Sequence, residues 1–353
     1  MRSFPFMATT PVNPQHPLQA LFDPGEPVPT PLPVCDHYCG VEARMRKSLA
    51  LQAQMGPVFD VTLDGEDGAP VGGEIEHAHL MAELLTGPGN LHGRVGVRVP
   101  PVDHRAFGDM VDVLIARAGH RLPYVMVPKA RGVADFQRAA DLIDDAMRRH
   151  GHEGQHLPLH ALVETHGALR EVDALAAHPR IESLSFGLMD FVSAHRGAIP
   201  SSAMGVAGQF DHPLIVRAKL EISAACHAHG KTPSHCVVTE LRHRKALESA
   251  VERAASLLGY TRMWSIHPDQ IPVIVEAFTP TVAEIDQAVE ILMAARTADW
   301  APIRHHDTLH DRASYRYFWH LLERAHRTAT AGSDALPAEV VDAFFSPQVL
   351  YKT

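Results

Sequence analysis

The sequence predicts an α/β fold, a TIM (β/α)8 barrel, on three observations. Short apolar runs alternate with helix-length amphipathic stretches along about 250 residues, which is the size and order of such a barrel. The chain has 353 residues, enough for one large α/β domain or two ordinary ones, and its hydrophobic fraction of 46% supports a full core. No Gly-x-Gly-x-x-Gly turn follows the first apolar run, and this disfavours the alternative, a doubly wound open sheet. The eight predicted strands are residues 32–36, 58–63, 93–99, 123–127, 157–163, 181–186, 234–238 and 262–266.

Helical periodicity fills the intervals between these strands. Residues 41–55, 131–149 and 241–258 carry apolar side chains at helical spacing. Two further helical stretches, 281–299 and 311–330, lie beyond the eighth strand and are extra to a barrel. We therefore expect a Pro-rich arm over residues 1–30, a catalytic barrel over 31–280 and a C-terminal helical extension or lid over 281–353.

Charge and composition exclude several classes of function. The 32 basic and 41 acidic residues give a formal net charge of -9, which disfavours a nucleic-acid partner or an anionic membrane surface. No apolar run is long enough for a transmembrane helix or a signal peptide. Four cysteines make no disulfide framework in a chain of this size. These observations predict a cytoplasmic protein that acts on small molecules.

An acidic loop follows the second predicted strand and is the most informative stretch of the chain. The strand ends in Asp64-Gly65-Glu66-Asp67-Gly68. Carboxylates packed this closely repel one another, so they need a cation or a hydrogen-bonding substrate to offset the repulsion. A solvated turn is the alternative.

Ionisable residues follow most of the other predicted strands as well. Any one of them alone is more often a surface residue or a helix cap. Their recurrence at the carboxyl ends of strands favours function, because in a barrel these ends converge on one mouth. The residues concerned are Arg98, Lys129, Glu164, Asp190 and His267.

The residue types indicate the chemistry. Glu164 and Asp190 are hard oxygen ligands without histidine or cysteine beside them, which favours Mg²⁺ over zinc. Arg98 suits a carboxylate or an enolate oxygen because its guanidinium is planar and permanently charged. A metal and an arginine that stabilise an enolate suit carbon–carbon cleavage. We interpret Lys129 as an ion-pair partner of the acids in preference to a Schiff-base nucleophile.

These segments resemble the HpcH/HpaI aldolase/citrate lyase family, in its citrate lyase beta-subunit branch with the malyl-CoA lyases. Asp64-Gly65-Glu66-Asp67-Gly68-Ala69 is similar to the family's Asp-Leu-Glu-Asp-Ala, and Val97-Arg98-Val99 to its Val-Arg-Val-Asn. The resemblance covers roughly residues 47–295, in family order. Its other segments are Val127-Pro128-Lys129, Val163-Glu164-Thr165, Ser185-Phe186-Gly187-x-x-Asp190, Ile266-His267-Pro268-Asp269-Gln270-Ile271 and Phe278-Thr279-Pro280.

The resemblance implies roles for particular residues. It implies a barrel that forms a homotrimer or homohexamer, with Mg²⁺ held by Glu164 and Asp190. It implies that Arg98 contacts the substrate's carbonyl and carboxylate, and that Glu66 and Asp67 orient metal-bound water and the arginine. Lys129 and His267 are expected at the substrate.

A lid residue is also implied. In the malyl-CoA lyase branch, a lid after the barrel brings an aspartate to a neighbour's active site. Asp311 lies where that lid's pattern would fall, although Ala313 replaces its proline.

Three departures from the family pattern affect the substrate. The opening strand is replaced by residues 32–38, Pro100 replaces an asparagine, and Arg262-Met263 replaces Gly-Lys. The first and third regions help to shape the acyl-CoA end of the pocket in relatives. We expect Asp36 and His37, at the end of the first strand, to supply substrate contacts; a capping turn is the alternative.

The resulting prediction is a Mg²⁺-dependent carbon–carbon lyase. It would cleave a β-hydroxy acyl-CoA, similar to citryl- or malyl-CoA, to an acyl-CoA and an α-keto acid such as oxaloacetate, glyoxylate or pyruvate, through an enolate stabilised by the metal and Arg98. Two alternatives stay open: an aldolase for a free hydroxy-keto acid without CoA, and a non-catalytic relative that binds a dicarboxylate.

Histidines are numerous, 25 in all, and the densest cluster is His305, His306 and His310. We favour an exposed turn for this cluster over a metal site, because metal-binding histidines usually come with ordered partners around them.

Overall fold

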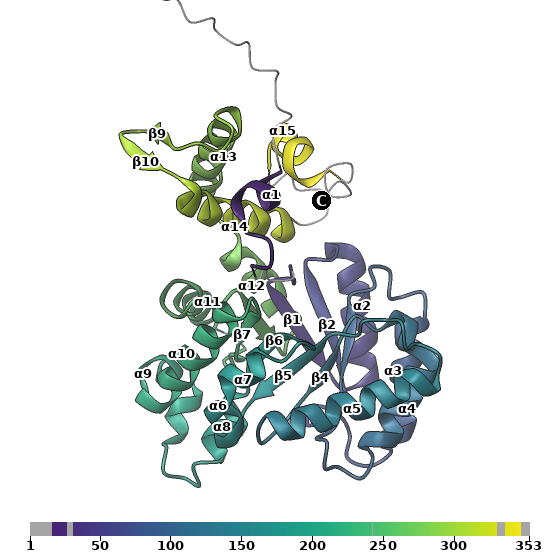
Figure 1. Ribbon diagram of the computed structural model, residues 1–353. Helices are drawn as coiled ribbons and strands as arrows, with labels where there is room; N and C mark the ends of the chain where they lie inside the picture. The colour runs from purple at the N-terminus through teal and green to yellow at the C-terminus, as the bar shows by residue number, and fades with distance from the viewer. Residues whose placement is uncertain (1–15, 27–30, 242, 330–335, 347–353) are drawn as a thin grey trace, which may run out of the picture. The chain divides into compact units, whose positions relative to one another are not determined.

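The computed structural model describes residues 16–26, 31–241, 243–329 and 336–346 (Figure 1). They form two compact units. Residues 31–279 make the barrel unit, and residues 16–26, 280–329 and 336–346 make the helical unit. No helix among the described residues is both long enough and apolar enough to cross a bilayer.

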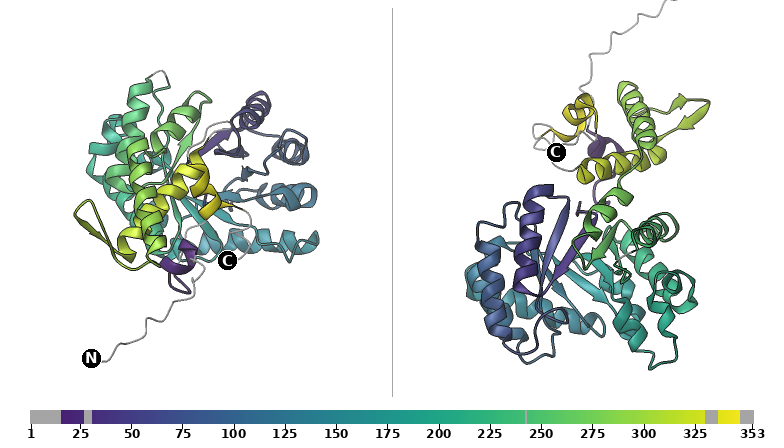
Figure 2. Two further views of the ribbon diagram at one scale, coloured as in Figure 1. Left: turned by 90° about the horizontal axis from the view of Figure 1, so that it is seen from above. Right: turned by 180° about the vertical axis from the view of Figure 1, so that it is seen from behind.

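A closed barrel of eight parallel strands, in the order β1 to β8, forms the first unit and confirms the predicted fold class. Helices surround the strands (Figures 1 and 2). The strands are β1 (Cys35–Cys39), β2 (Phe59–Asp64), β3 (Val95–Arg98), β4 (Val125–Val127), β5 (Leu159–Val163), β6 (Ile181–Phe186), β7 (Thr232–His235) and β8 (Arg262–Ser265).

The helices of the barrel unit follow the expected alternation with strands. Those predicted over residues 41–55, 131–149 and 241–258 correspond to α2, α5 and α11. The helices are α2 (Glu42–Met55), α3 (Glu74–Thr86), α4 (Phe107–Ala118), η1 (Gly119–Arg121), α5 (Val133–Arg149), α6 (His166–Arg170), α7 (Val172–Ala176), α8 (Leu188–Ser193), η2 (Ser201–Met204), α9 (Gly208–Asp211), α10 (Pro213–Ala228), α11 (Arg244–Leu258) and α12 (Gln270–Phe278).

The first strand begins three residues later than the sequence analysis expects, and this corrects the placement of Asp36 and His37. Cys35 pairs with Phe59 of β2 and Met263 of β8, so both residues lie inside β1 and not at its end. The prediction rests on a continuous apolar run, whereas the strand alternates apolar and polar side chains. In contrast, β7 begins at Thr232, two residues before its predicted start at residue 234.

Alternation along β2 explains where the polar residues go. Phe59, Val61 and Leu63 belong to the main apolar core, which includes residues of the surrounding helices. The intervening Asp60, Thr62 and Asp64 make polar contacts across the barrel, because successive side chains of a strand point to opposite faces. Every residue of β2 is buried, so the barrel interior is partly polar.

A buried ion-pair network fills part of that interior. Arg262, 1% exposed, contacts Asp60 at 2.6 Å and Asp36 at 3.0 Å. Arg94 contacts the other oxygen of Asp60 at 2.8 Å. The two carboxylates and two guanidiniums balance in charge, as burial of ions requires.

The helical unit contains α1 (Pro17–Leu21), α13 (Val282–Thr297), α14 (Arg312–Thr328), α15 (Ala338–Val340) and the π-helix η3 (Val341–Phe345). A two-stranded hairpin, β9 (Ile303–His305) and β10 (Thr308–His310), joins α13 to α14 (Figure 1). The core of this unit is apolar and separate from the barrel core, with Trp319 1% exposed and Leu292 fully buried.

Candidate active site

The carboxyl ends of neighbouring strands bring seven charged side chains into one cluster. They come from β2 and its following loop, from the end of β3, and from the segments after β4, β5 and β6. Contacts among them link the cluster, whose members are Asp64, Glu66, Asp67, Arg98, Lys129, Glu164 and Asp190.

Arg98 ends β3 and is held from two sides. Its Nε and Nη2 donate to Oδ1 and Oδ2 of Asp64 at 2.7 and 2.5 Å, and its Nη1 lies 3.0 Å from Oε2 of Glu66. Burial alone would lower the pKa of the guanidinium, but the charges of Asp64 and Glu66 outweigh burial and raise it. Arg98 is therefore a fixed cation at the mouth of the barrel.

Asp64 organises the acidic loop as well as the arginine. Its carboxylate accepts the N–H of Glu66 at 2.9 Å and the N–H of Gly68 at 3.0 Å. A Cβ on Gly68 would lie 3.1 Å from Cγ of Asp64 and closer still to Oδ2, so only glycine leaves the loop room to fold back. The sequence analysis placed Asp64 in the acidic loop without giving it a role, although the alternation of Asp60, Thr62 and Asp64 could have indicated an inward-facing carboxylate.

Lys129 lies among three carboxylates, as the ion-pair interpretation expects. Its Nζ is 2.5 Å from Glu66, 2.7 Å from Asp67 and 3.6 Å from Asp190. Burial opposes the charge, but hydrogen bonds to Asp67 and Glu66 outweigh it and raise the pKa of the ammonium. A lysine held charged in this way is a poor nucleophile.

The backbone at Lys129 is unusual. Its φ of 52° is in the left-handed region, which a residue with a side chain rarely adopts and which is typical of functional sites. In this conformation its N–H donates to Oε1 of Glu164 at 2.7 Å.

Glu164 and Asp190 form a pair of unequal carboxylates. Glu164, 3% exposed, follows β5, whereas Asp190 lies in the first turn of α8 with its side chain 40% exposed. Burial, together with the charge of Asp190, raises the pKa of Glu164 to about 8. Gly187 allows their approach, since a Cβ there would lie 2.5 Å from Cβ of Glu164.

Aromatic side chains beside Arg98 are a feature that the sequence analysis missed. The Tyr38 ring faces the guanidinium at 5.5 Å and stacks on Trp264, with ring centroids 4.3 Å apart. Both aromatic residues are buried within one small apolar cluster, together with Met126, Leu162 and Val237. Alternation along β1 and β8 could have indicated that Tyr38 and Trp264 face inward. The predicted first strand ended at residue 36 and so left Tyr38 outside it.

Other predicted residues lie apart from these contacts. Asp36 is fully buried against Arg262 and Thr62. His37, 1% exposed, shares a hydrogen bond of 2.9 Å with Ser265, and burial, aided by His267, lowers its pKa to about 4. Their roles at the substrate stay predictions.

His267 and Asp311 are more accessible. The His267 side chain follows β8, is 42% exposed and lies 3.6 Å from Asp269. Asp311 belongs to the helical unit, where it caps α14 by accepting the N–H of Ala313 at 3.0 Å. The lid role of Asp311 also stays a prediction.

The chain is similar to proteins of known family. A model of the HpcH/HpaI aldolase/citrate lyase family matches residues 46–268. An L-malyl-CoA/beta-methylmalyl-CoA lyase of Cereibacter sphaeroides is 26% identical over 252 residues, which are 67% of this chain and 77% of that protein. A malyl-CoA/beta-methylmalyl-CoA/citramalyl-CoA lyase of Chloroflexus aurantiacus is 28% identical over 56% of this chain and 61% of its own length.

Solved structures agree with this match. A citrate lyase of Burkholderia xenovorans LB400 is 53% identical and superposes with a TM-score of 0.80, over 93% of this chain and 99% of that one. The CitE protein of Mycobacterium tuberculosis, in complex with magnesium, acetoacetate and coenzyme A, is 20% identical with a TM-score of 0.63, over 84% and 98% of the two chains. At that identity the second likeness establishes the fold alone.

Proposed function

The chain belongs to the HpcH/HpaI aldolase/citrate lyase family and is a carbon–carbon lyase of it, and on this premise we propose its substrate and cofactor. The substrate is a β-hydroxy acyl-CoA of the citryl- or malyl-CoA kind. The products are an α-keto acid and an acyl-CoA, and the cofactor is Mg²⁺. Support comes from the malyl-CoA lyases among its relatives and from the structural relative that binds magnesium and coenzyme A.

The residues present fit a magnesium ion. Glu164 and Asp190 offer only carboxylate oxygens, the ligands that Mg²⁺ prefers. Burial and Asp190 together disfavour the charged form of Glu164, as its raised pKa records, and a divalent cation between the two carboxylates would offset both effects. When bound, the ion would act as a Lewis acid that polarises the oxygens of a chelating keto acid.

Arg98 supplies the fixed positive charge. Two of its five N–H groups donate to Asp64, and Nη1 lies 3.0 Å from Glu66 without donating to it, so both terminal nitrogens keep N–H groups for the substrate. Cleavage breaks the bond between the hydroxyl-bearing carbon and the α-carbon of the acyl group. The hydroxyl loses its proton, the keto acid's carbonyl forms, and the electron pair of the broken bond passes to the acyl group as an enolate. The enolate then takes up one proton at its α-carbon to give the acyl-CoA. A preorganised cation lowers the barrier because this charge develops in the transition state.

The other acids hold this arrangement. Glu66 contacts both Arg98 and Lys129, and Asp67 contacts Lys129, so the loop after β2 fixes the positions of two cations. In this proposal Glu66 and Asp67 also position water at the ion. Asp311 is the proposed proton carrier, delivered by the helical unit of a neighbouring copy in a homotrimer or homohexamer.

The observation that carries the proposal is the buried Glu164 carboxylate next to Asp190. Lys129 contacts both of them and also contacts Glu66, the acid beside Arg98. The test is turnover of citramalyl-, malyl- and citryl-CoA, with Mg²⁺ and with EDTA, followed by release of the keto acid. We expect turnover of at least one substrate that EDTA abolishes and that Glu164→Gln with Asp190→Asn abolishes as well. Activity that survives either treatment would overturn the proposal.

A second candidate keeps the reaction but omits CoA. It rests on the family resemblance, in which residues 32–38 replace the family's opening strand. Calorimetric titration with free CoA separates the two candidates. Binding of CoA supports the acyl-CoA lyase, and cleavage of a free hydroxy-keto acid without CoA binding supports the aldolase.

A further inference from the structure

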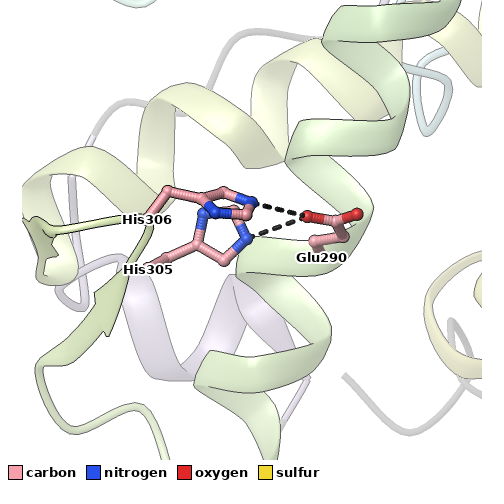
Figure 3. Close-up of side chains that lie close together, drawn as sticks. All are labelled: Glu290, His305 and His306. Carbon is pink, nitrogen blue, oxygen red and sulfur yellow. Dashed lines mark hydrogen bonds and ion pairs between the residues drawn. The ribbon is translucent and has the colours of Figure 1, made fainter.

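Three potential metal ligands converge in the helical unit (Figure 3). None of them belongs to the cluster of seven charged side chains in the barrel unit. Glu290 comes from α13, His305 ends β9, and His306 follows it in the turn. One ligand atom from each lies within 4.8 Å of the others. The Nε2 atoms of His305 and His306 lie 2.9 and 3.6 Å from the same oxygen, Oε2 of Glu290.

The hairpin backbone makes this convergence possible. Adjacent residues of a strand point to opposite faces, so two consecutive histidines would normally diverge. Here His306 has a φ of 43° and Asp307 a φ of 62°, the left-handed pair that a tight hairpin turn requires. The turn directs the His306 ring to the same side as the His305 ring, and their centroids are 4.1 Å apart. An ion pair between Arg304 and Asp307 spans the turn.

The donor set selects a class of metal. Two imidazole nitrogens and one carboxylate oxygen suit borderline transition metals such as Zn²⁺, whereas Mg²⁺ prefers oxygen ligands alone. Three protein ligands leave a fourth tetrahedral position to water. His306 and Glu290 have side chains 82% and 58% exposed, so an ion can enter from solvent without opening the fold.

We propose that Glu290, His305 and His306 bind a divalent transition metal ion of the Zn²⁺ class, which ties the β9–β10 hairpin to α13. The sequence favoured an exposed turn for His305, His306 and His310. Glu290 is fifteen positions before His305, and only the fold brings it to His305 and His306. The site uses none of the residues of the proposed lyase site, so each assignment stands or fails independently.

The experiment is a calorimetric titration of the EDTA-treated full-length chain with Zn²⁺. Excess Mg²⁺ is present so that it occupies the proposed site at Glu164 and Asp190. The readout is the difference between variants, because the chain has 25 histidines and imidazole is a common zinc ligand. We expect His306→Ala and Glu290→Gln each to weaken the tightest Zn²⁺ site at least tenfold, with unchanged circular dichroism and unchanged Mg²⁺-dependent turnover.

A matched control is His320→Ala. His320 is an exposed histidine of the same unit that contacts one carboxylate, Glu323, at 2.8 Å and belongs to no three-ligand group among the described residues. It should leave the Zn²⁺ isotherm unchanged. The proposal is overturned if His306→Ala and Glu290→Gln bind Zn²⁺ as the unaltered chain does, or if His320→Ala weakens binding as much as they do.

Discussion

Asp64 is predicted to be a positioning residue for Arg98, and Asp64→Asn tests this role. The substitution keeps the size of the side chain but removes its charge. The new amide N–H groups face Arg98 Nη2 and the Gly68 N–H in one orientation, and Arg98 Nε and the Glu66 N–H in the other. One charge-assisted hydrogen bond of the bidentate pair is lost outright. Glu66 remains 3.0 Å from Arg98 as the other counter-charge.

The magnitude follows from these contacts. Breaking a buried ion pair costs about 3–5 kcal/mol, and because Glu66 still offsets the charge we expect the lower end, about 3 kcal/mol of unfolding free energy. Displacement of Arg98 by about 1 Å should reduce kcat/KM about 100-fold. The assays are urea unfolding, kcat/KM on the best substrate of the acyl-CoA panel, and calorimetric binding of its keto acid.

Asp60→Asn is the matched control, because Asp60 is an equally buried carboxylate on the same strand. It pairs with Arg262 and Arg94 and lies four residues, roughly 13 Å, from Asp64 along β2. We expect a similar loss of stability with keto-acid affinity unchanged. Normal kcat/KM and keto-acid affinity in Asp64→Asn, or an equal loss of both in Asp60→Asn, would show that Asp64 does not position Arg98.

Two further predictions concern a buried lysine and a glycine. Burial lowers the pKa of Lys219 from 10.5 to about 8, so between pH 8 and 10.5 the unfolded chain binds more protons and the free energy of unfolding should rise with pH. In urea titrations, Lys219→Met should abolish that rise and increase the free energy of unfolding at pH 7 by up to about 3 kcal/mol. An unchanged pH profile in the variant would contradict the assignment. Gly187→Ala should displace Glu164 and weaken Mg²⁺ binding at least tenfold in calorimetry. The control is Gly108→Ala, which has open space at its Cβ and should leave Mg²⁺ binding unchanged. Equal Mg²⁺ binding in the two variants would show that Gly187 does not shape the site.

Much of the fold could be predicted from sequence because the layer between strands and helices is apolar. Phe59, Val61 and Leu63 mark β2 without ambiguity. The first strand was misplaced because its inward positions, Asp36 and Tyr38, are polar or amphipathic and interrupt the apolar run. A barrel interior that holds ion pairs cannot be recognised from local hydrophobicity, since each charge is compensated by a residue distant in the sequence.

The candidate site was predictable at the level of residue types and strand ends. Charged residues after β2 to β6 do converge, including Arg98, Lys129 and Glu164. The pairing within the cluster was not predictable. Which acid holds Arg98 depends on side-chain direction at the end of β2, and the contact of Tyr38 with that arginine depends on the register of β1.

The most direct test of the account is one crystal structure with Mg²⁺ and a keto acid such as oxaloacetate. We predict one ion bound by Glu164 and Asp190, the keto acid's carboxylate beside Arg98, and a water between Asp67 and the ion. An ion bound directly by Asp67, or density for neither ion nor keto acid near Arg98 at saturating concentrations, would contradict this prediction.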